Sequence, residues 1–297
     1  MSDWGKGVNN NIGWGQGANN DIGWGSIYDK SNAGDTLLGG GSGFDPDYQA
    51  VIDYANSESL TLPNSTIQNL QNDFAISINP FFSKFAELHF FAGEAGKSGF
   101  KSIDWARLNK ANYYNSPTFL ERGVKGNRTS AYIDLNFNAE IETTIDSLTF
   151  GFFLPNNYRT GSAYSNMGGS GLNNGGLLFL LSKDGDPFFS SNSDLNSIDD
   201  YNFESNPTKN LISLSSDGNI MTLREDENVL TTKSGLTPVQ SDVSVYLLAR
   251  HSTRFGAEEP IQFTDDIISL SFITNEELTS SEIGILSTAI KTYLNAI

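Results

Sequence analysis

The chain has 297 residues, with 18 Lys or Arg against 35 Asp or Glu, so its formal net charge is −17. This acidic balance argues against binding to nucleic acid or to anionic membranes through phosphate neutralisation. The absence of cysteine excludes disulfides, thiol nucleophiles and cysteine-ligated zinc, and two histidines leave little for histidine-based metal or acid–base chemistry.

The amino terminus carries a ten-residue unit, Trp-Gly-x-Gly-x-Asn-Asn-x-Ile-Gly, which is written twice and begun a third time. Ordering such a Gly- and Asn-rich segment costs about 1–2 kcal/mol per residue, which its few apolar side chains cannot offset alone. Trp and Ile at a fixed period are instead typical anchors for pockets on a partner. A low-complexity linker without a binding role is the alternative. We predict that residues 1–28 are a docking peptide, with the contact residues Trp4, Ile12, Trp14, Ile22, Trp24, Ile27 and Tyr28.

Residues 29–43 end in a glycine-rich run and have the composition of a flexible hinge. Asp45-Pro46 is typical of a helix start, and Asn64 or Ser65 can cap a second helix. In that second helix, apolar residues recur at helical spacing. Residues 44–83 are therefore predicted to be a helical connector. The sequence leaves open whether these helices pack on the rest of the chain or associate with copies of themselves.

From residue 84 onward, short β segments alternate with clusters of Gly, Asn, Asp and Pro, and this pattern predicts a β-sandwich over residues 84–297. The capping-box sequence Thr279-Ser280-Ser281-Glu282 precedes an apolar helical face, which predicts an amphipathic C-terminal helix packed on the sandwich. The predicted strands are residues 85–92, 130–135, 147–154, 176–181, 211–214, 219–223, 243–250 and 267–273.

Catalysis by a sandwich glycosidase needs paired carboxylates about 5–5.5 Å apart in the retaining enzymes. The usual pattern, Glu-x-Asp-x-Glu on a strand, is absent. Glu140-Ile141-Glu142 would place two carboxylates on one side of a strand, and Glu225-Asp226-Glu227 is expected at a solvated hairpin tip. His89 and His251 are expected to be strand residues with satisfied hydrogen bonds. We therefore assign no catalytic residue and expect the chain not to be an enzyme.

Two further patterns bear on ligands. Lys183-Asp184-Gly185-Asp186, with nearby aspartates, could supply oxygen ligands to Ca²⁺, but the geometry of an Asp-Gly turn explains the same residues, and no metal or other cofactor is expected. A sugar stacks on an aromatic ring while its hydroxyls bind fixed donors and acceptors. Loops 156–166 and 199–203 have that composition, so the candidate glycan-binding residues are Asn157, Tyr158, Arg159, Tyr164 and Tyr201.

Six segments of the chain occur in a characteristic order: residues 85–93, 103–109, 115–119 and 126–134, the closing segment 246–250 and the capped C-terminal helix. This order resembles that of concanavalin A/LamG-like domains in virion proteins of tailed bacteriophages, especially phages of Bacteroidota. The N-terminal repeats resemble those at the start of several fibre and tail proteins of such phages. The resemblance implies a mainly β jelly-roll sandwich with an extended N-terminal peptide, a short helical connector and a C-terminal helix. Calcium occurs in LamG-like domains.

This resemblance implies a phage structural protein, as a tail fibre, head fibre or decoration protein, that is located in the virion and commonly forms a homotrimer. Residues 1–28 would bind other virion proteins of capsid or tail, and the sandwich would attach to a host-surface glycan or decorate the particle. No secretory signal or membrane-spanning apolar run is visible, so synthesis in the host cytoplasm is expected, with neither nucleic acid nor membrane as a partner. The alternatives are a polysaccharide-cleaving enzyme on the same fold and a cellular lectin.

Overall fold

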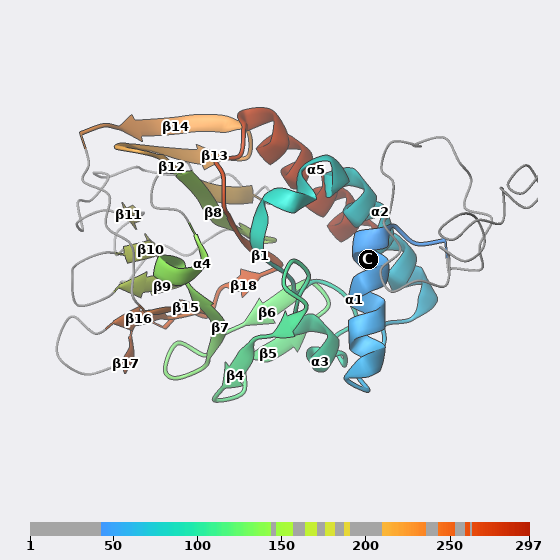
Figure 1. The fold of residues 1–297 in the computed structure, drawn as a ribbon. Helices are drawn as coiled ribbons and strands as arrows, with labels where there is room; N and C mark the ends of the chain where they lie inside the picture. The colour runs from blue at the N-terminus through green and yellow to red at the C-terminus, as the bar shows by residue number, and fades with distance from the viewer. Residues whose placement is uncertain are drawn as a thin grey trace, which may run out of the picture. The chain divides into compact units, whose positions relative to one another are not determined.

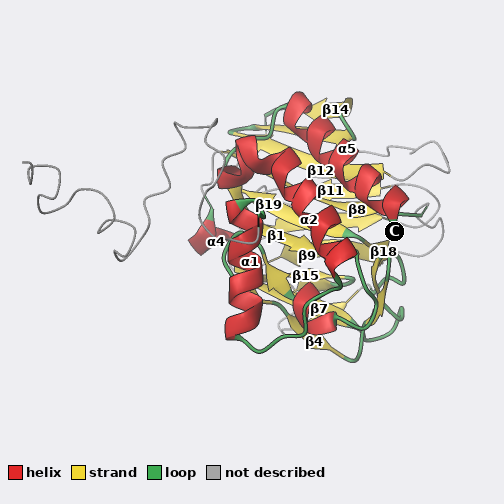
Figure 2. Ribbon diagram, turned by 90° about the vertical axis from the view of Figure 1, so that its right-hand side faces the viewer, coloured by secondary structure: helices red, strands yellow, loops and turns green. Residues whose placement is uncertain are grey.

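The computed structural model describes residues 43–143, 147–156, 164–170, 176–181, 187–190, 210–235, 243–252, 259–261 and 263–297. The predicted hinge lies outside these ranges apart from Gly43. All the predicted docking residues also lie outside them: Trp4, Ile12, Trp14, Ile22, Trp24, Ile27 and Tyr28. Phe44–Ile297 pack together in three layers, which are a group of helices, a first antiparallel sheet and a second sheet behind it (Figure 2).

The first sheet, sheet A, forms the middle layer (Figure 1). Its strands pair antiparallel in the order β14-β13-β12-β8-β19-β1-β2-β3. Neighbouring residues on its central strand, β8, point to opposite faces of the sheet and pack in different cores. Phe152 packs between the two sheets, and Phe153 packs under the helices. The strands are β1 (Phe85–Phe90), β2 (Ile103–Asp104), β3 (Asn109–Lys110), β8 (Ser147–Leu154), β12 (Asn210–Asp217), β13 (Ile220–Glu225), β14 (Asn228–Lys233) and β19 (Leu270–Thr274).

The second sheet, sheet B, has the order β11-β10-β9-β15-β7-β4. Strand β7 alternates, with Ile133, Leu135 and Phe137 buried between the sheets and Asp134 and Asn136 on the outer face. The strands of this sheet are β4 (Asn112–Tyr114), β7 (Tyr132–Asn138), β9 (Tyr164–Ser170), β10 (Gly176–Leu181), β11 (Pro187–Ser190), β15 (Ser244–Leu247), β16 (Arg250–Ser252) and β17 (Glu259–Ile261).

A small third sheet and three short helical segments complete the connections between the two large sheets. The small sheet contains β5 (Thr118–Leu120), β6 (Gly123–Lys125) and β18 (Ile267–Ile268). The short helical segments are η3 (Asn79–Lys84), α3 (Ser98–Lys101) and α4 (Ala139–Glu142).

The helices α1 (Pro46–Ser57), α2 (Ser65–Ile78) and α5 (Ser280–Ala296) cover the outer face of sheet A (Figure 2). Their predicted caps are confirmed: the side chain of Asp45 accepts from the N–H of Asp47, that of Asn64 accepts from Ile67, and Thr279 forms a capping box with Glu282. None of the described helices combines the length and the hydropathy needed for a membrane span.

The predicted connector, residues 44–83, packs on sheet A and shares one core with it, which answers the question that the sequence left open. Trp105 is at the centre of this core, with its ring 5.3 Å from Tyr48, 6.0 Å from Phe74 and 5.2 Å from Phe90 between centroids. Tyr293 of α5 meets Phe90 edge-on at 4.7 Å. The helices therefore supply aromatic side chains to a core that sheet A cannot complete alone.

The mainly β sandwich with a C-terminal helix is confirmed, and the strands predicted at residues 147–154 and 176–181 have the same ends as β8 and β10. The strand predicted at 243–250 is interrupted, because Leu248 adopts a φ of 66° between β15 and β16. The two- and three-residue strands β2 to β6 were not predicted, since so few residues carry no measurable periodicity.

We predict that a fragment of residues 44–297 unfolds cooperatively, whereas a fragment of residues 84–297 does not, because the latter leaves the faces of Phe90, Trp105 and Tyr293 uncovered. Trp105 is the one tryptophan in both fragments. Its emission during urea unfolding should begin blue-shifted in the longer fragment and red-shifted in the shorter one. A shorter fragment with buried Trp105 and a single cooperative transition would contradict this.

Candidate functional site

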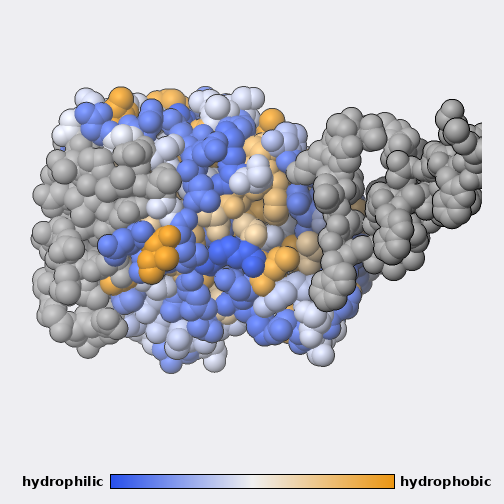
Figure 3. Space-filling model, in the orientation of Figure 1, coloured by the Kyte–Doolittle hydropathy of each residue, from blue (hydrophilic) through white to orange (hydrophobic). Residues whose placement is uncertain are grey.

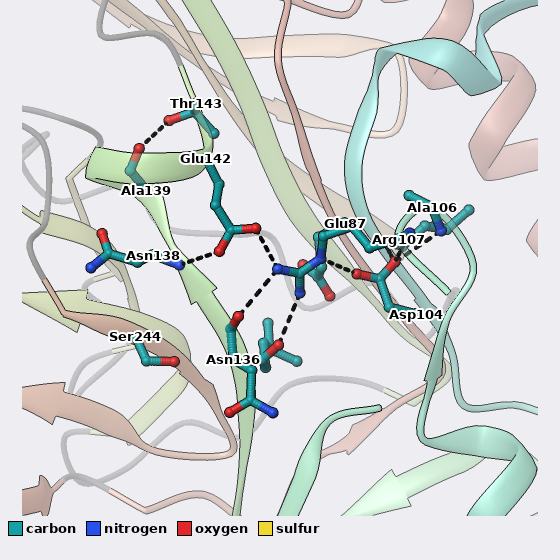
Figure 4. Close-up of polar contacts among 12 residues, drawn as sticks. Glu87, Asp104, Ala106, Arg107, Asn136, Asn138, Ala139, Glu142, Thr143 and Ser244 are labelled. Carbon is teal, nitrogen blue, oxygen red and sulfur yellow. Dashed lines mark hydrogen bonds and ion pairs between the residues drawn. The ribbon is translucent and has the colours of Figure 1, made fainter. Parts of the chain in front are cut away.

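A buried cluster of charged side chains connects sheet A to sheet B around Arg107, which follows β2 (Figure 4). Arg107 Nε donates to Asp104 Oδ2 at 2.5 Å, and Nη1 donates to Glu142 Oε2 at 2.5 Å. The guanidinium also donates to the carbonyl oxygens of Leu135 and Asn136 on β7, at 3.0 and 3.1 Å. One side chain therefore links the edge of sheet A to β7 and to α4.

Asp104 is fully buried and is held from several sides besides Arg107. Its Oδ1 accepts from the backbone N–H groups of Leu88, Ala106 and Arg107, at 3.0, 2.9 and 3.3 Å. Buried carboxylates of this kind are tolerated because charge-assisted hydrogen bonds replace water. Asp104, Arg107 and Glu142 therefore form a structural link between the two sheets, which we call the clasp.

Glu87 and His89 lie on the same face of β1, next to this clasp, and neither side chain is exposed. His89 Nε2 is 3.2 Å from Glu87 Oε1, and the ring stacks on Phe91 with centroids 5.5 Å apart. Burial raises the pKa of the Glu87 carboxyl, with a further increase from Asp104, and burial lowers the pKa of His89 to about 4. Both shifts favour the uncharged forms, a protonated carboxyl beside a neutral imidazole.

His89 lies on β1, so the expectation of a strand residue is confirmed, but its ring nitrogens and the Glu87 oxygens form no well-aligned hydrogen bond among the described residues. Glu87 could supply a proton, but Glu87, His89 and Asp104 are all sealed from solvent. Only Arg107 and Glu142 reach the surface, at 18% and 28% exposure of their side chains. A substrate therefore cannot touch the proton donor in this conformation.

The carboxylate pair expected at Glu140 and Glu142 does not exist as predicted, because these residues form helix α4 rather than a strand. Residues two apart on a helix point in different directions. Glu142 binds Arg107 and accepts from the backbone N–H of Asn138 at 3.0 Å, whereas Glu140 is exposed. Figure 3 shows an isolated hydrophobic spot over α4, where Ile141 is 79% exposed.

The expectation for Glu225-Asp226-Glu227 is correct for the position of the turn, between β13 and β14, and for the exposure of Glu227, but wrong for Asp226, which is partly buried. Asp226 adopts a φ of 52° and accepts from Leu211 N at 3.1 Å, Ser287 Oγ at 2.5 Å and Lys291 Nζ at 2.5 Å. Two of these donors belong to α5, so the turn holds the C-terminal helix on sheet A.

Most of the predicted ligand-binding residues lie outside the described residues: Asn157, Tyr158, Arg159, Tyr201 and the aspartates considered for Ca²⁺. Tyr164 begins β9, where its backbone pairs with Leu181. In the part of the chain that is described, no group of three or more His, Asp or Glu side chains could hold a metal ion.

The outer face of sheet B carries a row of stacked rings that was not predicted from the sequence. Tyr114 stacks on Tyr132 with centroids 4.6 Å apart and planes 7° from parallel, and Tyr132 lies 4.7 Å from Tyr246. Tyr246 stacks on His251 at 4.2 Å and 4°. His251 Nδ1 is 2.9 Å from Ser244 O, so the expectation of a satisfied strand histidine is confirmed here. The signal for the row was the alternation in β7, which places Tyr132 and Asp134 on one face.

No protein-family model and no curated protein sequence matches the chain. Solved structures that match include a mutant of Trypanosoma rangeli sialidase displaying trans-sialidase activity (15% identity, 82% of this chain and 38% of that chain, TM-score 0.51). The binding domain of botulinum neurotoxin serotype D also matches (13% identity, 73% of this chain and 53% of that chain, TM-score 0.51). The chain therefore spans about a third to a half of these proteins' lengths, and the similarity shows the fold alone.

The expectation that this chain is not an enzyme is wrong. It rests on the predicted fold and the missing motif, but sialidases, which are enzymes, are among the matching structures. The absence of the Glu-x-Asp-x-Glu pattern rules out one arrangement of carboxylates, not every chemistry that a protein containing this fold performs. At this identity, the comparison transfers no catalytic residue to the chain.

We predict that Arg107→Ala destabilises the protein by about 3–5 kcal/mol, because it leaves the buried carboxylate of Asp104 without its cation. Urea unfolding measures the change. The matched control is Lys110→Ala, which removes an exposed pair with Glu58 and should cost far less because solvent screens that pair. Equal losses in the two variants would show that the clasp contributes nothing particular.

We predict that His89→Gln weakens the loss of stability on acidification. His89 has a pKa of about 4 in the folded protein against 6.5 when unperturbed, so the unfolded chain takes up its proton first as the pH falls. The wild type should therefore lose about 2 kcal/mol more than the variant between pH 7.5 and pH 4.5. Glu87, whose raised pKa acts in the opposite direction, remains in both proteins. Parallel pH profiles of urea unfolding would contradict the assignment.

Proposed function

We propose that the chain is a structural protein of a bacteriophage particle, mounted through residues 1–28, whose sandwich binds carbohydrate on the host surface. The observation that carries this proposal is the periodic placement of Trp4, Trp14 and Trp24 in a glycine-rich leader. Exposed tryptophans are unfavourable in a segment without a binding task, and a fixed period matches pockets repeated on a neighbouring molecule.

Two features of the body support a binding role. The similar toxin structure is described as a binding domain, and a similar sialidase structure contains sialic acid (15% identity, 74% of this chain and 38% of that chain, TM-score 0.50). The outer face of sheet B also carries aromatic rings beside amide and hydroxyl side chains, the combination that a sugar requires.

The proposal includes a homotrimer on the particle. Several copies held on one particle would bind a surface rich in one glycan far more tightly than a single copy, because the second and third contacts are intramolecular. Weak binding by each sandwich is therefore compatible with firm attachment of the particle.

We predict that deleting residues 1–28 abolishes incorporation into particles while leaving the body folded. Incorporation is measured by immunoblotting of particles purified from phage-producing cells, and folding by the emission of Trp105, which is buried in the body. A variant with alanine at Trp4, Trp14 and Trp24 keeps the length and the glycines, so it separates loss of the anchors from loss of the spacer. Normal incorporation of both variants would refute the docking role.

A further inference from the structure

The row of rings on sheet B ends at the edge of the sheet, on Tyr114 of β4. One face of the Tyr114 ring is covered by Tyr132, and the residue is nevertheless 40% exposed. The residue therefore keeps accessible surface that Tyr132 does not cover. The inner rings of the row are far less accessible, as Tyr132 at 9% and His251 at 7% show.

The stack fixes the orientation of this terminal ring before any ligand arrives. Tyr114 and Tyr132 are register partners of β4 and β7, and Tyr132 is supported in turn by Tyr246 and His251. A ring held in this way loses little rotamer freedom when a second flat surface stacks on it. Tyr113, the preceding residue, points to the interior and packs on Phe119, which anchors the edge strand from the other side.

Short neutral polar side chains frame this edge of the sheet. Asn115 follows Tyr114 and donates from Nδ2 to Ser130 O at 3.0 Å. Asn127 Oδ1 accepts from the backbone N–H groups of residues 129, 130 and 131, at 3.0, 2.9 and 2.8 Å, and its Nδ2 donates to Ser130 Oγ at 3.2 Å. These amides are exposed but held in place, so they can exchange hydrogen bonds with ligand hydroxyls at a low entropic cost.

The charges near this ring favour a neutral ligand, because Arg128, which lies in the same turn as Asn127, is already paired with Asp265 at 2.9 Å. Asn112, two residues before Tyr114 on β4, is the register partner of Asp134 on β7 and donates from Nδ2 to Asn136 Oδ1 at 3.0 Å. Asp134 is a fixed acceptor on this face, since its Oδ1 receives hydrogen bonds from Ser244 Oγ and Asn136 N. Its carboxylate, in a chain with a net charge of −17, attracts hydroxyl donors and repels acidic sugars.

We infer that the outward face of Tyr114 is the stacking platform for a neutral pyranose unit of a glycan, with its hydroxyls bound by the surrounding amides and by Asp134. A ring framed by amide side chains matches the apolar face and hydroxyl edge of a pyranose. The inference rests on the proposed function, and it names both the part of the sandwich that binds and the class of sugar.

The test measures binding of the full-length protein to neutral gluco-, galacto- and manno-oligosaccharides, with sialyllactose as the acidic member, by calorimetry and saturation-transfer NMR. A neutral oligosaccharide should bind, and Tyr114→Ala should weaken it by about tenfold or more. Tyr114→Phe keeps the ring and should bind within about threefold of the wild type. The matched control is Ile220→Ala, which truncates a side chain of equal exposure (39%) on β13 of sheet A and should leave binding unchanged.

Three results of the binding measurements would overturn the platform: no member of the panel binds, sialyllactose alone binds, or Tyr114→Ala binds as the wild type does. The thermal midpoint verifies that Tyr114→Ala remains folded. Particles carrying Tyr114→Ala should incorporate the protein normally but adsorb poorly to host cells. Normal adsorption with normal incorporation would refute the platform and leave the proposed mounting on the particle intact. The incorporation of variants that lack the N-terminal tryptophans tests only the mounting, not the platform.

Discussion

The central strands of sheet A, β12, β8, β19 and β1, are buried on both faces, and this constraint explains most of the architecture. Consecutive residues of β8, Phe152 and Phe153, belong to two different cores. A sheet of this kind cannot be stable with one layer of partners, because each exposed core side chain would forfeit about 1.5–3 kcal/mol of burial. The helices α1, α2 and α5 on one side and sheet B on the other are therefore equally necessary, and the segment before residue 84 belongs to the fold.

Burial on both faces also makes polar side chains in sheet A costly. Asp104 meets this cost with an arginine and three backbone N–H groups, whereas Glu87 and His89 avoid part of it by favouring their uncharged forms. Replacing such groups with apolar ones is often neutral or stabilising in proteins, so their presence is not explained by stability alone. In this protein, Arg107 binds the carbonyl oxygens of β7 and so fixes how one sheet lies on the other.

Sheet B differs, because the helices α1, α2 and α5 lie on the side of sheet A that faces away from it (Figure 1). On the outer face of sheet B, a row of packed rings reaches the surface at Tyr114, beside exposed amide side chains. A fold shared with a sialidase and a toxin binding domain assigns no site on this face, and the proposed site is defined by Tyr114 and its neighbours.

The sequence by itself determined features that depend on neighbouring residues: the caps at Asp45, Asn64 and Thr279, the apolar face of α5, the long strands β8 and β10, and the periodic tryptophans of the leader. The tertiary structure decided what depends on residues distant in the chain. Glu142 lies on a helical turn and binds Arg107, and Asp226 binds Lys291 of α5. Tyr114 became the end of a stack drawn from four strands. Local patterns report backbone preference and periodicity, whereas cross-strand partners are set by sheet register, which no single segment of the sequence encodes.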